Sequence, residues 1–462
     1  MINCQSLVLQ KFRSTLFALL LLIASGSSVS VAPAATPTSE PSTATPTPSS
    51  ATLPLPYSDP LKLVAIPETS PPRDVQSPFL WPSTGFVPLA FEANKTFAKL
   101  GDLDVFEMRD RLYAVQKRNP GGYVLTDVTN PAEPAYLGTW ELNPHAGGEH
   151  IEAFRQGDHW YLVLPLEDDW AQGLLCGLAI IEITDPLDPI LQGLHKGLTV
   201  GAGVNWCDVH SVDIINDENG NAEYMLAAAS DTFDLRVLDI SNLNNIQEIN
   251  VYHHHVHPHG IGGTARIKHV SYAHMVTTID NRVYVSHWEG GVMILDKTAL
   301  LSGRDAKDVE LTTPGSIAAT NFAAHDAYPT NDGKFLFVND AFISEGGIRL
   351  FDIRDPARAQ IVQTLNFEGL RSKRHTLLVQ DDLLFVPWFQ EGVRVFRYDV
   401  SQADKPVLEP VAFQEVREQP RNIYDGVFRL RLHDCQVDGE MRTCVFASDM
   451  TLGLIILALD DV

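Results

Sequence analysis

From about residue 95 onward, hydrophobic and polar residues form one short pattern that returns at a nearly constant interval. A glycine or a small polar residue is followed by four mostly apolar residues and then usually by an acidic one. Seven copies are present, and their starts are 55, 57, 57, 56, 45 and 61 residues apart. They begin at Gly122, Gly177, Asp234, Gly291, Gly347, Gly392 and Gly453. Repetition at this period is typical of chains built from similar, stacked units.

Each unit contains four runs with the composition of β-strands. In the fourth unit they are residues 273–279, 282–287 and 291–295, followed by a weaker edge run after Thr313. Runs rich in Val, Ile, Leu, Phe and Tyr between turn residues predict strands, and no run is long enough for an amphipathic helix. Four strands per repeat predict an all-β fold, a seven-bladed β-propeller of four-stranded blades.

The two ends of the repeat region predict how the ring closes. The last unit stops after its third strand, so its outer strand must come from elsewhere in the chain. Residues 97–101, just before the first unit, resemble the outer strand at residues 136–140. We therefore expect an N-terminal segment to complete the seventh blade, which also hides a sheet edge.

The repeats resemble those of a known family. Runs such as Tyr123-Val124-Leu125-Thr126-Asp127-Val128-Thr129-Asn130-Pro131 resemble the LVIVD-repeat propellers, a family of mostly exported bacterial and archaeal proteins. The resemblance covers about residues 95–462 and is distantly shared with the selenium-binding protein and methanethiol oxidase group. It implies a propeller that can hold a histidine-bound metal, but the repeat itself implies no single reaction.

The N-terminal region predicts export. Lys11 and Arg13 precede a short apolar run, and small residues follow, so residues 1–31 are typical of a signal peptide. Residues 32–75 are rich in Pro, Ser and Thr and predict a disordered stalk, which leaves residues 76–462 for the propeller. We expect a secreted, periplasmic or cell-surface protein without a transmembrane segment.

The cysteines and the net charge predict disulfide bonds and limit the possible partners of the protein. Four cysteines remain after the signal; Cys435 and Cys444 flank a predicted hairpin turn and are expected to pair, which leaves Cys176 with Cys207. The net charge of −24 makes nucleic acid an unsuitable partner. We expect a monomer that binds a small molecule, a protein or a glycan.

Histidines recur at or near the start of the first strand in six of the seven units. They are His150, His210, His274, His325, His375 and His433, while the first unit has Asp102 or Asp104 there. First strands line the central channel of a propeller, so these imidazoles are expected to converge at one mouth of the channel. Three or four of them could bind a transition metal such as Cu, Zn, Fe or Mn, and the protein could then be an oxidoreductase or a hydrolase.

A structural interpretation competes with the metal site. In Trp-Asp repeat propellers a similarly placed histidine bonds to a turn aspartate of its own blade. The turns after the second strands here carry acidic residues, namely Asp169, Asp231, Glu289, Asp340 and Asp449. They could be the partners of such ties, or they could orient metal-bound histidines. With ties alone, the protein would be a non-catalytic binding module for a protein or a glycan.

Two further clusters are expected at the same mouth. The loop before the fourth unit contains His253, His255, His257 and His259, which could form an auxiliary metal-binding loop or simply be polar. Trp170, Trp288 and Trp388 follow the second strands and could form an aromatic rim, although such residues more often cap the core between blades.

Overall fold

The computed structural model describes the chain from Lys62 to Asp460 with gaps. The described ranges are 62–66, 77–96, 98–143, 147–167, 176–196, 206–253, 272–313, 315–318, 322–340, 347–365, 367, 374–402, 406–416 and 425–460. They belong to one compact unit, residues 55–462. The signal peptide expected at residues 1–31 lies outside the described residues.

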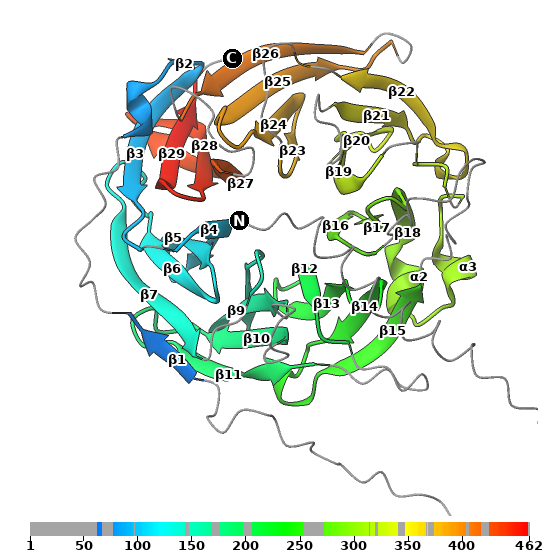
Figure 1. The fold of residues 1–462 in the computed structure, drawn as a ribbon, viewed down its shortest axis with the longest axis horizontal. Helices are drawn as coiled ribbons and strands as arrows, with labels where there is room; N and C mark the ends of the chain where they lie inside the picture. Colours follow the sequence, from blue (N-terminus) through cyan, green and yellow to red (C-terminus); the bar gives the residue numbers. More distant parts are fainter. Residues whose placement is uncertain are drawn as a thin grey trace, which may run out of the picture. The chain divides into compact units, whose positions relative to one another are not determined.

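The described strands form seven antiparallel sheets around a common axis, as the sequence predicts (Figure 1). From blade 1 to blade 7, the innermost strands are β4 (Leu100–Met108), β8 (Glu152–Gln156), β12 (Val209–Asn216), β16 (Met275–Ile279), β19 (Ala324–Pro329), β23 (Leu378–Gln380) and β27 (Val427–Val437). The second strands are β5 (Arg111–Arg118), β9 (His159–Leu166), β13 (Ala222–Ala229), β17 (Arg282–Ser286), β20 (Phe335–Asp340), β24 (Leu383–Pro387) and β28 (Glu440–Asp449).

The third strands contain the apolar repeat itself. They are β6 (Gly122–Asp127), β10 (Gly177–Glu182), β14 (Asp234–Asp239), β18 (Val292–Asp296), β21 (Ile348–Asp352), β25 (Val393–Asp399) and β29 (Gly453–Leu459). The outer strands are β7 (Ala135–Asn143), β11 (Ile190–His195), β15 (Gln247–His253), β22 (Gln360–Leu365), β26 (Val407–Gln414) and β3 (Phe86–Ala93). The fold is therefore the predicted seven-bladed propeller.

Glycine begins most copies of the repeat because the outer strand passes very close to it. Gly122 has a φ of +145°, and a Cβ there would lie 2.2 Å from the carbonyl oxygen of Trp140 on β7. At Gly392 the φ is +80°, and a Cβ would lie 2.0 Å from the oxygen of Gln414 on β26. Only glycine combines this backbone conformation with so close an approach.

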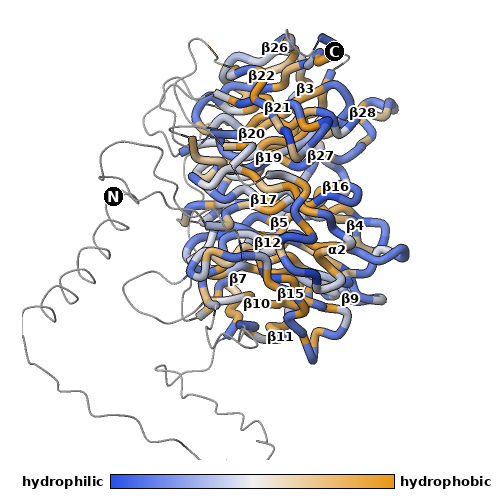
Figure 2. The backbone as a smooth tube through the Cα atoms, turned by 90° about the vertical axis from the view of Figure 1, so that its right-hand side faces the viewer, coloured by the Kyte–Doolittle hydropathy of each residue, from blue (hydrophilic) through white to orange (hydrophobic). Residues whose placement is uncertain are grey.

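The core lies between neighbouring blades. Leu125 of blade 1 and Leu162 of blade 2 belong to one buried cluster, and Phe385 of blade 6 and Ile455 of blade 7 belong to another. Both faces of a blade are therefore covered, which explains why its third strand is apolar at consecutive positions. Seen from the side, hydrophobic segments run through the blades while many turns between them are hydrophilic (Figure 2).

An N-terminal strand closes the ring, but it is not the predicted segment. β3 pairs with β29 from Ala93 opposite Gly453 to Phe86 opposite Leu459. Leu100 and Gly101, which the sequence placed in the outer strand, instead begin the innermost strand of blade 1. The prediction failed because it left no residues to cross the blade. An outer and an inner strand lie three strand spacings apart, about 14 Å, which needs at least about four extended residues.

The N-terminal segment also covers two more sheet edges. β1 (Lys62–Ala65) pairs with β7 of blade 1, and β2 (Ser83–Thr84) pairs with β26 of blade 6. A short 3-10 helix, η1 (Pro78–Leu80), precedes β2, and Gln414 donates a hydrogen bond to the carbonyl of Pro78. Lys62–Ala65 lies inside the segment predicted as a disordered stalk, so at least this part of it is ordered against the propeller.

Blade 4 departs from the four-stranded plan. Its described residues after Thr313 include no outer strand, and before Thr313 it has two short helices, α2 (Lys297–Leu301) and α3 (Ala306–Val309), and an isolated bridge between Leu295 and Glu310. Val292 N donates to the carbonyl of Ile317, so irregular chain covers part of this edge. Two short 3-10 turns, η2 (Leu243–Asn245) and η3 (Pro356–Arg358), lead into the outer strands of blades 3 and 5.

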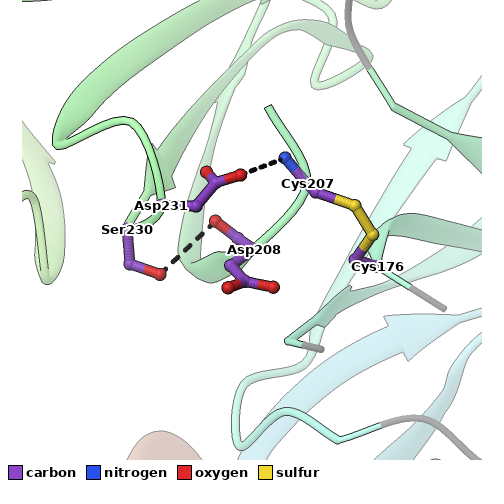
Figure 3. The surroundings of a disulfide bond; sticks show 5 residues. All are labelled: Cys176, Cys207, Asp208, Ser230 and Asp231. Carbon is purple, nitrogen blue, oxygen red and sulfur yellow. Dashed lines mark hydrogen bonds between the residues drawn. A yellow bond between two sulfur atoms is a disulfide. The ribbon is translucent and has the colours of Figure 1, made fainter. Parts of the chain in front are cut away.

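Both predicted disulfides are present. Cys435–Cys444 links the two strands of the β27–β28 hairpin, and Cys176–Cys207 links blade 2 to the segment that enters blade 3. Asp231 accepts a hydrogen bond from the Cys207 amide and so holds the second pair against blade 3 (Figure 3). None of the helices in the described part of the chain is both long and apolar enough to cross a bilayer.

Candidate functional site

The pairing registers align the innermost strands and divide their residues into three belts around the axis. Asp104, Glu152, Asp213, Thr277, Tyr328, Leu378 and Arg431 occupy equivalent positions, and we call them the lower belt. Two residues earlier lies the middle belt, Asp102, His150, Ser211, Met275, Asp326, Thr376 and Arg429. One residue before that lies the mouth belt, Gly101, Glu149, His210, His274, His325, His375 and Phe428.

Four of the six predicted histidines occupy the mouth belt and contact each other in order. The ring centroids of His210 and His274 are 3.9 Å apart, those of His274 and His325 are 4.5 Å apart, and those of His325 and His375 are 4.6 Å apart. These residues come from four consecutive blades, so their contacts join blades 3 to 6. The structure brings these four together as the repeat suggested.

The Nδ1 atoms of three of these imidazoles face acceptors. His210 Nδ1 lies 2.7 Å from Glu167 Oε1, His274 Nδ1 lies 3.1 Å from the His325 carbonyl oxygen, and His325 Nδ1 lies 3.3 Å from Asp326 Oδ1. Such contacts favour the tautomer with the proton on Nδ1 and leave Nε2 as the ring's basic nitrogen. The chemistry of the row is therefore that of oriented imidazole bases.

Burial and crowding keep most of the row neutral. Burial lowers the pKa of His274 well below its ordinary value, and the neighbouring His210 and His325 lower it further. The pKa of His375 is also well below normal, because of burial and the proximity of His325 and Arg429. At His210 burial also lowers the pKa, but the nearby carboxylates of Glu167 and Glu149 outweigh this effect, and the pKa of His210 is raised.

His150 lies in the middle belt rather than with the four mouth histidines. Its Nε2 is 2.9 Å from Asp102 Oδ2, and the other oxygen of Asp102 is 3.0 Å from Nε of Arg429. Burial lowers the pKa of His150 despite this carboxylate. Burial alone would raise the pKa of Asp102, but Arg429 and His150 hold it well below its ordinary range. The first-unit aspartate predicted near the channel is thus the centre of a buried ion pair.

His433 does not lie at the mouth of the channel, where it was predicted. His433 lies five residues beyond the mouth belt along β27, is partly exposed, and its Nδ1 is 2.7 Å from the Asp434 carbonyl oxygen. The seventh mouth residue is Phe428, whose ring stacks on His375 with centroids 3.5 Å apart. A register shift falls between Val427 and Arg429, as it does around His210 and His325, which confirms the equivalence.

Three of the predicted acidic turn residues have partners other than the histidines. Asp231 accepts from the Cys207 amide, Asp340 pairs with Arg349 at 2.7 Å, and Asp449 accepts from the amides of Thr451 and Leu452 in its own turn. Glu289 lies in the turn between β17 and β18. Asp169 lies outside the described residues.

Asp326 links the mouth histidines of blades 5 and 6. Besides facing His325, it accepts hydrogen bonds from Asn339 Nδ2 at 3.0 Å and from the Leu377 amide at 2.6 Å. Asn339 also donates to the carbonyl of His375. Asp326 and Asn339 are almost fully buried. The spacing of the histidines gave no hint of this network, although Asp326 directly follows His325 in sequence.

The lower belt is charged, which the histidine pattern did not predict. Asp104 pairs with Arg431 across the blade 7–blade 1 junction, with Nε to Oδ1 at 2.9 Å. Its other oxygen accepts from the Ala153 amide of blade 2 at 2.8 Å, and Glu152 accepts from the Ile214 amide of blade 3 at 3.3 Å. Each carboxyl thus binds the backbone of the next blade. An alignment of the seven units at the position two residues after the middle belt would have revealed these charged residues in the sequence.

The predicted aromatic rim is only partly formed. Trp288 is partly exposed and lies beside His274, with centroids 4.7 Å apart, and it stacks on Tyr272 at 5.7 Å. Trp388 is buried in the core and lies under Arg374, so it has the capping role that was the alternative. Phe389, with a φ of 33°, is instead the residue next to His375. Trp170 lies outside the described residues.

The auxiliary histidine loop is described only at its first residue. His253 ends β15, the outer strand of blade 3, and its Nδ1 is 2.5 Å from Asp234 Oδ1. His255, His257 and His259 lie outside the described residues. Within the described ranges, no group of three or more His, Cys, Asp or Glu side chains is arranged to hold a metal ion.

Comparison with known proteins adds no assignment. No protein-family model matches this chain, and none of the curated proteins matches it in sequence. Membership of the LVIVD-repeat family stays a prediction from the repeat pattern.

Proposed function

We propose that this protein is an exported β-propeller that binds a transition metal ion through the imidazoles of its mouth belt. The observation that carries the proposal is the contiguous row of His210, His274, His325 and His375, one from each of four consecutive blades. The two disulfides support export, because such bonds persist in oxidising compartments.

The donor chemistry of the row suits Cu, Zn, Fe or Mn. Metals bind the neutral imidazole, and burial lowers the pKa of His274, His325 and His375. A carboxylate or carbonyl at Nδ1, as at His210 and His274, is the usual outer partner of a metal-bound histidine. Because no described group of three or more potential ligands has a metal-binding arrangement, binding would require side-chain rotation to bring the Nε2 atoms together.

The metal would supply the reaction class. A bound Cu, Fe or Mn ion would support oxidoreductase chemistry, and a bound Zn ion would support hydrolysis. The residues of this chain would hold the ligands in place: Glu167 and Asp326 would fix the orientation of His210 and His325.

The test is elemental analysis of the full chain, purified without a histidine tag and then stripped and reloaded with Cu, Zn, Fe or Mn. The informative variant is His274→Phe/His325→Phe, because Phe428 shows that the mouth belt accepts a phenyl ring. We expect one ion in the parent and none in the variant. Quenching of Trp288 fluorescence by Cu(II) gives a second readout, since its ring lies 4.7 Å from that of His274.

Two control variants separate the mouth from other histidines. His433→Ala removes an imidazole outside the mouth belt, and His255→Ala/His257→Ala/His259→Ala removes the loop cluster. Metal retained in both controls supports the mouth belt. Metal lost only in the loop variant would move the site to that loop, and absence of metal from the reloaded parent would leave the alternative, a binding module without metal.

A further inference from the structure

Two arginines on the innermost strand of blade 7 form a feature that the metal proposal does not use. Arg429 belongs to the middle belt and Arg431 to the lower belt, and β27 pairs regularly with β28 between them. Residues two apart on a regular strand lie on the same face. The two guanidinium groups therefore follow each other along one side of β27.

Each guanidinium is held through one nitrogen. Nε of Arg429 is 3.0 Å from Asp102 Oδ1, and Nε of Arg431 is 2.9 Å from Asp104 Oδ1. The terminal amino groups of both arginines form no hydrogen bond to another described residue. The side chains are 13% and 19% exposed, so these donors are accessible although the arginines are mostly buried. Arg431 donates a hydrogen bond from Nε to Asp104, which orients its planar group, whereas Arg429 and Asp102 form an ion pair without a hydrogen bond from Nε. In both arginines the terminal N–H groups are left for a ligand.

The strand that carries the two arginines places both charges on the inner side of the ring. Arg429 and Arg431 lie on β27, the innermost strand of blade 7. Their partners Asp102 and Asp104 lie on β4, the innermost strand of blade 1. The two ion pairs therefore join the inner strands of neighbouring blades.

Asp102 and Asp104 balance the charges of the two arginines, so the remaining carboxyls nearby determine how strongly an approaching anion is repelled. Burial, Asp213 and Asp104 raise the pKa of Glu152 well above its ordinary value, and burial raises the pKa of Asp213 to about 6. Both shifts favour the protonated carboxyls at mildly acidic pH, and a protonated carboxyl repels an anion less and can donate a hydrogen bond to it.

We propose that Arg429 and Arg431 form a binding site for a small oxyanion, a carboxylate or an inorganic phosphate or sulfate, between the inner strands of the propeller. Planar guanidinium groups with accessible terminal N–H groups match the oxygens of such ions. The site does not depend on a metal, so it stands or falls separately from the proposed function.

The experiment is isothermal titration of the metal-stripped full chain at pH 5.5 with succinate, phosphate and sulfate in turn. We expect one saturable site, and the anion that binds most tightly separates a carboxylate from an inorganic oxyanion. Arg431→Gln should weaken binding at least about tenfold, because it removes charge-assisted hydrogen bonds. Asp104→Asn should strengthen binding, because it removes a competing negative charge beside Arg431.

The control is Arg442→Gln, on the neighbouring strand β28, where the arginine pairs with Glu440 and Asp460 at the surface. It should bind the anion like the parent, and circular dichroism should show that every variant is folded. If no anion gives saturable binding to the parent, or if Arg431→Gln and Arg442→Gln bind alike, the proposal is overturned. Weaker binding by folded Asp104→Asn would also contradict it.

Discussion

The two sides of the propeller's centre differ in their chemistry. On the side of blades 3 to 6, the mouth belt consists of four imidazoles in contact with each other. On the side of blades 7, 1 and 2, the mouth belt has no histidine, and the middle belt just below it contains Arg429, Asp102 and His150 in a buried ion-pair network. The repeat thus determines where a side chain lies, but not whether it contributes a neutral base or a charge.

The mouth belt and the lower belt also depend on pH in opposite ways. Burial lowers the pKa values of His274 and His375, so the stability that these neutral imidazoles contribute is lost as the pH falls. Glu152 and Asp213 in the lower belt have raised pKa values, so the stability that their protonated forms contribute is lost as the pH rises. Substitutions in the two regions therefore test this difference directly.

The largest effect is expected from breaking the charged side. Asp102→Ala leaves Arg429 buried without its carboxylate, and breaking a buried pair in this way costs about 3–5 kcal/mol of unfolding free energy. Urea unfolding at pH 7 measures the cost. His274→Phe, which keeps an aromatic ring in the mouth belt, should cost clearly less. Equal losses in the two variants would remove the distinction between the sides.

The second largest effect on stability is expected at Asp213, which with Glu152 forms the pair of carboxyls with raised pKa values. Because the pKa of Asp213 is raised to about 6, its contribution is fully present below the unfolded-state pKa near 4 and is lost as pH rises through 6. Relative to wild type, Asp213→Asn should gain up to about 3 kcal/mol between pH 4 and pH 7. Urea titrations at several pH values measure this difference. Glu218→Gln, in the exposed β12–β13 turn, should show no such gain.

The histidine side should give the opposite slope. The pKa of His375 is well below its ordinary value, so its contribution is present above the unfolded-state pKa of about 6.5 and is lost as the pH falls. His375→Phe should therefore flatten the loss of thermal stability between pH 7 and pH 5, measured by differential scanning calorimetry. His159→Phe, on the exposed end of β9, serves as the control, and an unchanged slope in His375→Phe would contradict the prediction.

The smallest effect is expected at His433. This residue lies outside the mouth belt and bonds only locally, so His433→Ala should change the unfolding free energy by no more than about 0.5 kcal/mol. A larger loss, or a change in the contacts of His375, would mean that His433 belongs with the other histidines after all.

The sequence predicted the parts of this molecule that repeat and missed those that occur once. All seven copies of the apolar pattern are third strands, and in five of them the first residue is a glycine that the outer strand approaches too closely for a Cβ, namely Gly122, Gly177, Gly291, Gly392 and Gly453. The closing strand was misplaced, since local similarity at residues 97–101 says nothing about the distance that the chain must then cross. The outer strand predicted for blade 4 was also wrong. The edge of this blade is paired through a single bridge at Glu310, and one bridge leaves no strand pattern in the sequence.

The candidate site likewise has a part that the repeat predicted and a part that it did not. Position in the repeat predicted that His210, His274, His325 and His375 lie together. His433 was included because it is the nearest histidine, whereas the strand register identifies Phe428 as the seventh mouth residue. The Asp326 network and the Arg429–Asp102 pair join different blades, and such contacts depend on which blades are neighbours across a closed ring. No spacing within one unit can reveal them.

The way the ring closes has a consequence for the order of events when the chain is made. Ala93 on β3 pairs with Gly453 on β29, so a strand synthesised early finds its partner only after 360 further residues have been added. Until then, the apolar residues of β3 have no sheet to join, and blade 7 cannot assemble. Contacts so distant in sequence form slowly. Completion of this propeller therefore follows the synthesis of β29, and a chain interrupted before β29 would remain an open ring with two unprotected edges.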